Sequence, residues 1–524
     1  MTDRIRLNEG NRRWWTLAAM CFALFMIMLD NTVVNVALPS IQRDLGASLS
    51  GLEWTVNIYT LTFAVLLVTG GRLGDILGRR KMFLFGVVVF ALSSAAIGFA
   101  PGQGWLVAGR ALQGVGAAFM MPATLSIITV TFPPEERGKA IGTWAGVSAL
   151  ALAIGPVVGG ALTEYVSWRA IFFLNLPVAV GAVIVTLFAA HESRDETSRH
   201  SIDWPGIAAI STGLTALVLA LIEGNSWGWG SARVVSLLIT AAVGLTAFAI
   251  VERRVREPMV DFSLFRERTF LGANAIAFIV TFSMLAMFFF TALYMQNILG
   301  YSAIQAGVRF LPSTLMIVLV APLAGRLADR IGPRLPMVVG LTLTSLALFL
   351  QTRIEVGTGY GLLLPAFILM GLGMALVMSP MSTAAMNSVP PQKAGVASGI
   401  VSMSRMVGGT FGVAALGALF QHLARNELTH SLAGTGISAA QQERLVQSLG
   451  SASDGAHLPP AAAEAAQNAF VHALANGMWL SAGVAATGAL LAFWLIGGKP
   501  VRQPDAATEP QAAAAVAEAA AEAA

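Results

Sequence analysis

The sequence predicts an all-α polytopic membrane protein with about fourteen transmembrane helices. Of its 524 residues, 56% are hydrophobic and only 11% are charged, whereas about 25% are charged in an ordinary soluble domain. Runs of about 20 apolar residues, long enough to cross a bilayer, recur along the chain. Because these runs lack the two-residue alternation of barrel strands, we expect the spans to be helices.

The spans fall into three groups. Six are expected in the first part of the chain, two after the polar segment HESRDETSRH, and six in the last part. Their approximate ranges are 14–36, 54–70, 82–100, 105–130, 140–162, 170–190, 205–223, 233–251, 270–296, 304–324, 335–352, 359–380, 394–424 and 469–496.

Five regions follow from these spans. We expect an N-terminal segment, a first six-helix bundle, two inserted helices, a second six-helix bundle with a long outer loop, and a disordered alanine-rich tail. Their ranges are 1–13, 14–190, 203–251, 269–497 (outer loop 425–468) and 498–524.

Lysine and arginine residues indicate how the spans are oriented. With the N-terminus inside, inner segments carry 23 of the 32 basic residues, outer segments carry 7, and Arg110 and Arg405 lie within spans. Since basic residues accumulate on the cytoplasmic side, we expect both termini in the cytoplasm. We expect the protein to lie in the inner (cytoplasmic) membrane of the cell. We expect a monomer embedded in the lipid bilayer.

Two halves of the chain resemble each other. The stretch GRLGDILGRR at 71–80 returns as GRLADRIGPR at 325–334, and Pro133-Pro134 returns as Pro390-Pro391. Gly142 matches Gly399 at the same offset of 257 residues as the proline pair. A parallel duplication of six helices is typical of transporters whose halves rock around a central site. The pattern therefore predicts transport.

Other function classes have little support in the sequence. The six histidines show no metal-ligand spacing, and no GxxxxGK[ST] phosphate loop occurs. We therefore expect no enzyme activity, no cofactor, no metal site and no direct use of ATP. The net charge of +4 is explained by the inner loops and predicts no nucleic-acid partner. The two-half repeat argues against a passive channel.

Four stretches identify a family resemblance. LDNTVVNVALP (29–39), GRLGDILGRR (71–80), the segment 106–118 with Arg110 and Gln113, and GPVVGG (155–160) resemble the motifs of the major facilitator superfamily, specifically its fourteen-span drug:proton antiporter branch. Trp168-Arg169 and Asn175-Leu176-Pro177 resemble the sixth-helix pattern of that branch. The resemblance implies two six-helix bundles plus two inserted helices, and export coupled to protons.

Asp30 and Arg110 are the first candidate site residues, because a charge at the membrane centre costs about 2.5–3.5 kcal/mol on insertion scales. Asp30 is expected to accept a proton or to balance a cationic substrate; alternatively it is a structural acid bonded to Asn31, Asn35 or a helix end. Arg110, a fixed positive charge, is expected to tune a nearby acid, unless it snorkels to the surface. The family motif adds Gln113.

Arg405 lies deep in the thirteenth span. It is expected to face Asp30 or the cavity, or to pack against carbonyls of a broken helix.

The duplicated stretch supplies a candidate gate. Gly71, Asp75, Gly78, Arg79 and Arg80 are expected in a short loop, where the glycines Gly71 and Gly74 allow helix ends to approach. Asp75 can then cap a helix N-terminus of the opposite half, a contact typically worth about 0.3–1 kcal/mol. The family implies a latch that holds the outward-open state. In the second copy, Asp329 is the weaker candidate because Pro333 alters the turn.

Glycines also mark the fifth span. Gly155, Pro156, Gly159 and Gly160 match the family's antiporter motif, and glycines four residues apart permit close helix contact. They are expected to seal the two halves against leak; as glycines alone, they predict only a packing face.

Two transport hypotheses remain open from the sequence. The first is a proton-coupled secondary exporter of hydrophobic or cationic drugs or antibiotics that works by alternating access. The second is an exporter dedicated to one endogenous metabolite or lipid.

Overall fold

The computed structural model describes residues 9–46, 49–195, 203–255, 258–301, 303–432 and 460–498. In this part of the chain every regular element is a helix, which confirms the all-α prediction. Thirteen helical spans are long and apolar enough to cross a membrane, and α5 supplies a fourteenth when its two segments are counted together. Much of the expected outer loop (433–459) and nearly all of the expected tail (499–524) lie outside the described residues.

The first half contains six spans, the last of them made of α6 and α7 together. Within it, α3 and α2 pack on α4, while α1 packs on α5 and α7. The helices are α1 Glu9–Leu45, α2 Leu49–Leu77, α3 Arg79–Gly98, α4 Gln103–Thr131, α5 Pro134–Tyr165, α6 Ala170–Phe173 and α7 Asn175–Ala189.

Two inserted helices and the second half follow. The two inserted helices, α8 and α9, pack against each other, and α8 also contacts α2 and α14. The elements are α8 Trp204–Trp227, α9 Ala232–Arg254, η1 Phe262–Arg266, α10 Arg268–Asn297, α11 Ala303–Ile331, α12 Arg334–Gln351, α13 Tyr360–Asn387, η2 Pro391–Lys393, α14 Ala394–Ser431 and α16 Pro460–Leu495.

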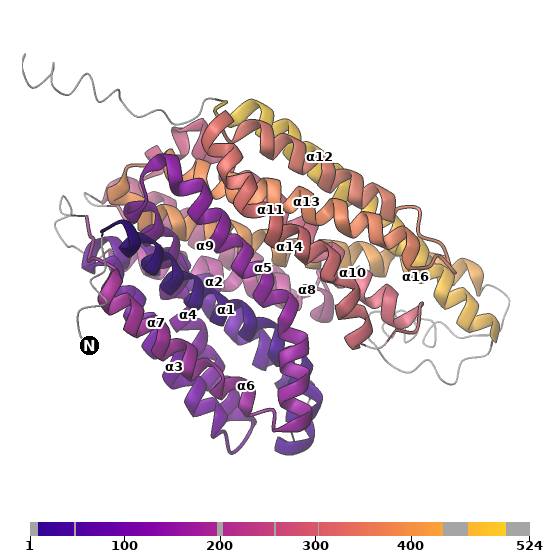
Figure 1. Cartoon of the computed structure of the whole chain (residues 1–524). Helices are drawn as coiled ribbons and strands as arrows, with labels where there is room; N and C mark the ends of the chain where they lie inside the picture. The colour runs from indigo at the N-terminus through magenta and orange to yellow at the C-terminus, as the bar shows by residue number, and fades with distance from the viewer. Residues whose placement is uncertain are drawn as a thin grey trace, which may run out of the picture.

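The halves meet mainly through two helix pairs, α5 with α11 and α2 with α14, and also where α4 contacts α14 and α5 contacts α13. In Figure 1 the first half (indigo to purple) and the second half (orange to yellow) lie together at the upper left and diverge toward the lower and right edges. The contact is therefore concentrated toward one end of the molecule.

The stretch expected to form a loop is helical except at one residue. α2 ends at Leu77 and α3 begins at Arg79, so Gly71 and Asp75 lie in the last turns of α2. Gly78 alone reverses the chain with φ +116°, a conformation that glycine adopts without steric cost. In the second copy Gly332, with φ +89°, precedes Pro333 between α11 and α12. We call the end of the molecule that holds both turns the Gly78 end.

α5 is bent by 40° between its segments Pro134–Leu152 and Val157–Tyr165. The break between the segments contains Pro156, which has no N–H to donate to the preceding turn, the usual cause of a sharp kink. The two segments of α5 therefore face different neighbours.

Candidate functional site

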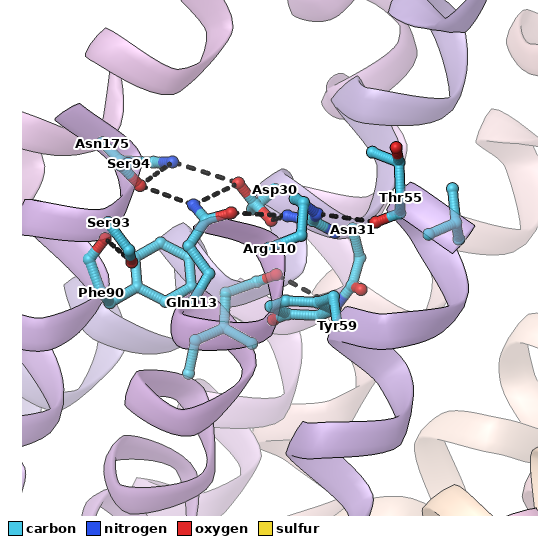
Figure 2. Close-up of polar contacts among 12 residues, drawn as sticks. Asp30, Asn31, Thr55, Tyr59, Phe90, Ser93, Ser94, Arg110, Gln113 and Asn175 are labelled. Carbon is cyan, nitrogen blue, oxygen red and sulfur yellow. Dashed lines mark hydrogen bonds and ion pairs between the residues drawn. The ribbon is translucent and has the colours of Figure 1, made fainter. Parts of the chain in front are cut away.

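A buried ion pair joins α1 to α4. The side chains of Asp30 and Arg110 are 0% and 1% exposed, and Arg110 Nη1 donates to Asp30 Oδ2. Arg110 Nε donates to the Thr55 carbonyl of α2 at 3.1 Å, and its Cζ lies 4.2 Å from the ring centroid of Tyr59. Figure 2 shows the guanidinium between the Asp30 carboxylate and the Tyr59 ring. Arg110 is thus held by two neighbouring helices.

Three further buried side chains surround the carboxylate. Gln113 Oε1 accepts from Arg110 Nη1 at 2.8 Å, and Gln113 Nε2 donates to Asp30 Oδ1 at 3.3 Å and to Ser94 Oγ at 2.6 Å. Asn175 Nδ2 donates to Asp30 Oδ1 at 3.2 Å and to Ser94 Oγ at 3.2 Å. We call Asp30, Ser94, Arg110, Gln113 and Asn175 the Asp30 cluster. It draws side chains from α1, α3, α4 and α7 (Figure 2).

The predicted alternatives for Asp30 and Arg110 can now be compared with the structure. Asn31 Nδ2 donates to the Ile27 carbonyl and Asn35 Nδ2 to the Asn31 carbonyl, and neither side chain bonds to Asp30 in the described part of the chain. The expectation that these asparagines hold Asp30 is therefore wrong. The snorkelling alternative for Arg110 is also wrong, because the side chain is buried.

Arg405 does not join this cluster. Its side chain on α14 is half-buried, and its Nε has no hydrogen-bond partner among the described residues. The contacts of Asp30 recorded for the described chain come from Arg110, Gln113 and Asn175 instead. The expectation that Arg405 faces Asp30 is wrong, since nearer donors of the first half already surround that carboxylate.

Asp75 joins the two halves at the Gly78 end. Its side chain is 0% exposed, and its two oxygens accept from the backbone N–H groups of Gly395 and Val396, each at 2.8 Å. These groups belong to the first turn of α14, so Asp75 caps a helix N-terminus of the opposite half, as the sequence suggested. A Cβ on Gly71 would lie 2.3 Å from the Gly395 carbonyl oxygen. Only glycine allows α2 and α14 to approach this closely.

Arg79 and Arg80 differ in their environments. Arg79 is 2% exposed, pairs with Asp75 at 2.7 Å, and donates to the carbonyls of Pro391 and Gln392 at 2.7 and 2.8 Å. Charge at a membrane surface does not account for so buried an arginine. The backbone N–H of Arg80 donates to Glu192, and its side chain donates to the Leu187 carbonyl. Arg79 therefore ties the halves together, whereas Arg80 bonds within its own half.

Asp329 makes the matching contact from the second half. Its oxygens accept from the backbone N–H groups of Gly138 and Lys139, at 3.1 and 3.2 Å, in the second turn of α5. Pro333 does not prevent this, because Asp329 lies in the last turn of α11, before the chain reverses at Gly332. The expectation that the second copy is altered by its proline is wrong for this contact between the halves.

The antiporter-motif glycines pack within one half. A Cβ on Gly155 would lie 1.8 Å from Thr32 Oγ1, and one on Gly159 would lie 2.9 Å from Val33 Cα. Both neighbours belong to α1, so these glycines do not seal the two halves, and that expectation is wrong. A Cβ on Gly160 would meet only Val36 Cγ1, at 3.8 Å. Beyond the bend at Pro156, α5 follows α1 rather than α11.

Other glycines of α5 face the second half. A Cβ on Gly138 would lie 2.4 Å from the Gly325 carbonyl oxygen, and one on Gly142 would lie 2.5 Å from the Ala321 carbonyl oxygen, both on α11. Gly74, by contrast, meets its nearest neighbours only at 3.9 Å. It therefore plays no part in the close approach expected of it.

Sequence reasoning missed several residues of this site. Ser94, Thr55 and Tyr59 drew no attention, because single polar residues are common in such helices. Asn175 was noticed only as part of a family pattern and received no role. The signal that could have found these residues is that they lie at the same depth as Asp30. Recognising it requires knowing how four helices pack.

Membrane-length helices arranged in two similar halves, with a buried ion pair in one of them, are features of a membrane transporter. The sequence profile of the Major Facilitator Superfamily matches residues 20–413. The chain belongs to this family, and it is a multi-pass membrane transporter rather than an enzyme.

Similar proteins support this assignment. The puromycin resistance protein pur8 of Streptomyces alboniger is 41% identical over 410 residues, covering 77% of this chain and 81% of that protein. The tetracenomycin C resistance and export protein of Streptomyces glaucescens is 39% identical over 408 residues, covering 78% and 76%. A crystal structure of the human organic anion transporter TETRAN shares the fold, with a TM-score of 0.60 at 14% identity over 92% of this chain and 99% of that one.

Proposed function

We propose that this protein exports hydrophobic or cationic drugs or antibiotics in exchange for protons, by alternating access. The observation that carries the proposal is the buried pair of Asp30 and Arg110. A carboxylate shielded from water needs stabilising partners to stay charged, because burial favours its neutral form. Here the positive charge of Arg110 and the amide donors of Gln113 and Asn175 hold it in place.

Proton binding at Asp30 would change these contacts. A neutral carboxyl group no longer attracts Arg110, whose guanidinium keeps its bonds to Gln113 and the Thr55 carbonyl. Because Asp30 lies on α1, the loosened contact with α4 gives α1 freedom to move during the transport cycle. One inward proton releases about 2.3 kcal/mol per 100 mV of membrane potential, which export can draw on.

In this proposal, the two halves move relative to each other during the transport cycle. Asp75 and Asp329 hold them together at the Gly78 end, and we propose that this end faces the cytoplasm because most basic residues lie in the inner segments of the chain. The structure then represents the outward-facing state. Both termini lie inside under this orientation, and the protein works in the cytoplasmic membrane as a monomer.

Relatives support the substrate class. Their names include puromycin resistance, tetracenomycin C resistance and export, and a multidrug resistance protein of Mycobacterium tuberculosis strain H37Rv, which is 39% identical over 405 residues. Because two of these names specify one compound each, the second candidate is an exporter dedicated to a single endogenous metabolite or lipid. A susceptibility panel in a host without its own efflux pumps separates the two: protection against several unrelated compounds supports multidrug export, and protection against one supports the dedicated exporter.

Proton coupling is tested in everted membrane vesicles. After energisation has acidified the lumen, a substrate from the panel should release protons in vesicles with the wild-type protein. Asp30→Asn, expressed to the same level, should abolish this release, whereas Asn35→Ser, a change at an exposed residue that bonds only within α1, should retain it. Unchanged exchange in Asp30→Asn removes Asp30 from the mechanism.

A further inference from the structure

The inserted helices carry a pair of carboxyl groups that the transport mechanism above does not use. α8 and α9 approach closely at their glycines, since a Cβ on Gly244 would lie 2.8 Å from Gly213 Cα. At the Gly78 end of this pair, Asp203 precedes α8 and Glu252 lies in the last turn of α9. The inserted pair rests on α2 and α14, the helices joined by Asp75.

Each carboxyl group uses one oxygen and leaves the other free. Asp203 Oδ1 accepts from the N–H of Gly206 at 2.9 Å as the N-cap of α8, and Glu252 Oε2 accepts from the N–H of Val260 at 3.1 Å. Asp203 Oδ2 and Glu252 Oε1 are buried and have no hydrogen-bond partner among the described residues. The Glu252 side chain is 4% exposed.

The two unpartnered oxygens point to the same place. A Cβ on Gly206 would lie 2.3 Å from Asp203 Oδ2 and 2.9 Å from Glu252 Oε1. The oxygens are therefore no more than about 5 Å apart, and only the absence of a side chain at Gly206 leaves room for both.

Two ionised carboxylates at this separation repel each other, and each free oxygen has lost its water. A single proton removes the repulsion, and the neutral carboxyl group can donate to its partner once the two side chains move closer together. Other charges near Glu252 are few. Arg72 of α2 acts on it from a distance, Arg253 and Arg254 follow it on α9, and Asp261 beyond Val260 is already paired with Lys393.

We propose that Asp203 and Glu252 hold one proton between them, forming a proton-binding site on the inserted helices separate from Asp30. The site lies beside α2, on the side that carries Arg72. Arg72 precedes Asp75 by three residues in the sequence. Loss of its proton adds a negative charge within electrostatic range of Arg72, so the inserted pair responds to the proton concentration at the Gly78 end. This inference does not depend on which substrate is exported.

The test uses an apolar carbodiimide, which enters lipid and reacts with protonated carboxyl groups. The full-length protein in lipid nanodiscs is labelled near neutral pH, and modified residues are located by peptide mass spectrometry. We expect Glu252 to be labelled ~tenfold more than Glu223 of the same inserted pair, which lies at the other end of α8, because only Glu252 shares a proton. Labelling of Glu252 should fall as the pH is raised.

Asp203→Asn provides the matched variant. Asparagine also caps helices well, so the start of α8 is kept while the second carboxylate is lost, and labelling of Glu252 should drop at least severalfold. Equal labelling of Glu252 and Glu223 overturns the proposal, as does unchanged labelling in Asp203→Asn. Protection of Glu252 by divalent cations without any dependence on pH overturns it as well, since that result defines a cation site.

Discussion

The Asp30 cluster shows what burying a charge requires. Removing one ion from water costs several kcal/mol even after relaxation. The attraction within a buried pair offsets this cost only when further hydrogen bonds satisfy both groups. Asp30 has three donors, and Arg110 has two acceptors besides Asp30 together with the Tyr59 ring. Each charge is therefore stable only in the presence of the other.

The first prediction concerns this mutual dependence. Asp30→Asn leaves Arg110 buried without its counter-charge and should destabilise the protein by about 3–5 kcal/mol. Adding Arg110→Gln removes the stranded charge, so the double variant should regain most of the thermal stability and still fail to exchange protons. Thermal unfolding in detergent, followed by tryptophan fluorescence, measures this. If the double variant is no more stable than Asp30→Asn, the two side chains do not act as a pair.

The second prediction separates the shape of Arg110 from its charge. Lysine keeps the charge but offers a compact ammonium in place of the planar fork. It cannot reach Asp30, Gln113 and the Thr55 carbonyl together, so Arg110→Lys should lower proton-coupled transport at least about tenfold, the effect of losing roughly 1.4 kcal/mol of transition-state or binding energy. Initial rates in everted vesicles measure this. Transport near the wild-type rate would show that charge alone is sufficient.

The sequence located the two charges of the cluster but not their partners. Asp30 and Arg110 stood out individually, because each is costly in a membrane helix. Ser94 could not be distinguished from its neighbour Ser93, which bonds to the Val89 carbonyl of its own helix. Which serine turns toward the carboxylate depends on how α3 packs on α4, and residue type does not contain that information.

At the scale of elements, α5 has two functions along its length. Its first turns face α11 of the other half, and its last turns, beyond the bend, face α1 next to the Asp30 cluster. The sequence predicted that glycines would line a tight contact, and they do. It could not predict the neighbour, because a run of glycines shows only that a helix approaches something closely.

The third prediction compares two adjacent glycines. Gly159→Ala should place a methyl group 2.9 Å from Val33 Cα, so the backbone of α1 or α5 must shift. Gly160→Ala makes only an ordinary contact at 3.8 Å. We expect Gly159→Ala to lose about 1–3 kcal/mol, the usual cost of overpacking, while Gly160→Ala stays close to wild type. Thermal unfolding of both variants decides this, and equal stabilities would contradict the α1–α5 contact.

The connector before α10 is fastened to the start of α14. Lys393 Nζ lies 2.5 Å from Asp261 Oδ2, and the backbone N–H of Ser263 donates to the other oxygen of Asp261. Burial opposes the charge on Asp261, but the hydrogen bonds from Lys393 and Ser263 outweigh it and lower the pKa of Asp261 to about 2. The ordinary value is 3.8.

The fourth prediction follows from the sign of that shift. Because the folded protein holds Asp261 ionised more strongly than the unfolded chain does, the pair stabilises the protein above the ordinary pKa and stops doing so as the pH falls through about 2. Asp261→Asn should lower the melting temperature at neutral pH and flatten the loss of stability on acidification. Glu164→Gln, at an exposed position, serves as the control. A parallel shift of the whole curve in Asp261→Asn would contradict the ion pair.

At the scale of the whole molecule, two related contacts hold the halves together. Asp75 of α2 accepts from the first turn of α14, and Asp329 of α11 accepts from the second turn of α5. The duplication predicted from the sequence thus produces a nearly symmetric closure, in which each half donates one carboxylate and one helix N-terminus. The two stretches differ at four positions, and one difference bears on the closure: Pro333 stands in the second copy where Arg79 stands in the first.

The fifth prediction concerns this difference. Asp75→Asn removes the charge at the start of α14, commonly worth about 0.3–1 kcal/mol and up to about 2 kcal/mol when buried, and it also leaves the buried Arg79 without its carboxylate. Asp329→Asn loses only the first of these contributions, because Asp329 is less buried and pairs with no arginine in the described part of the chain. We therefore expect both variants to shift the halves toward opening at the Gly78 end, and Asp75→Asn to shift them further.

Distances between spin labels measure that opening. Cysteines introduced at Lys81 of α3 and Leu335 of α12, both exposed near the Gly78 end, report on opposite halves once Cys21 is replaced by alanine. In the wild-type protein a single short distance should dominate. A longer distance should appear in Asp329→Asn and should be more populated in Asp75→Asn. Since Arg79 also donates to two carbonyls beside α14, the double variant Asp75→Asn/Arg79→Gln should open furthest. Equal populations in Asp75→Asn and Asp329→Asn would mean that the helix caps alone, without Arg79, hold the halves closed.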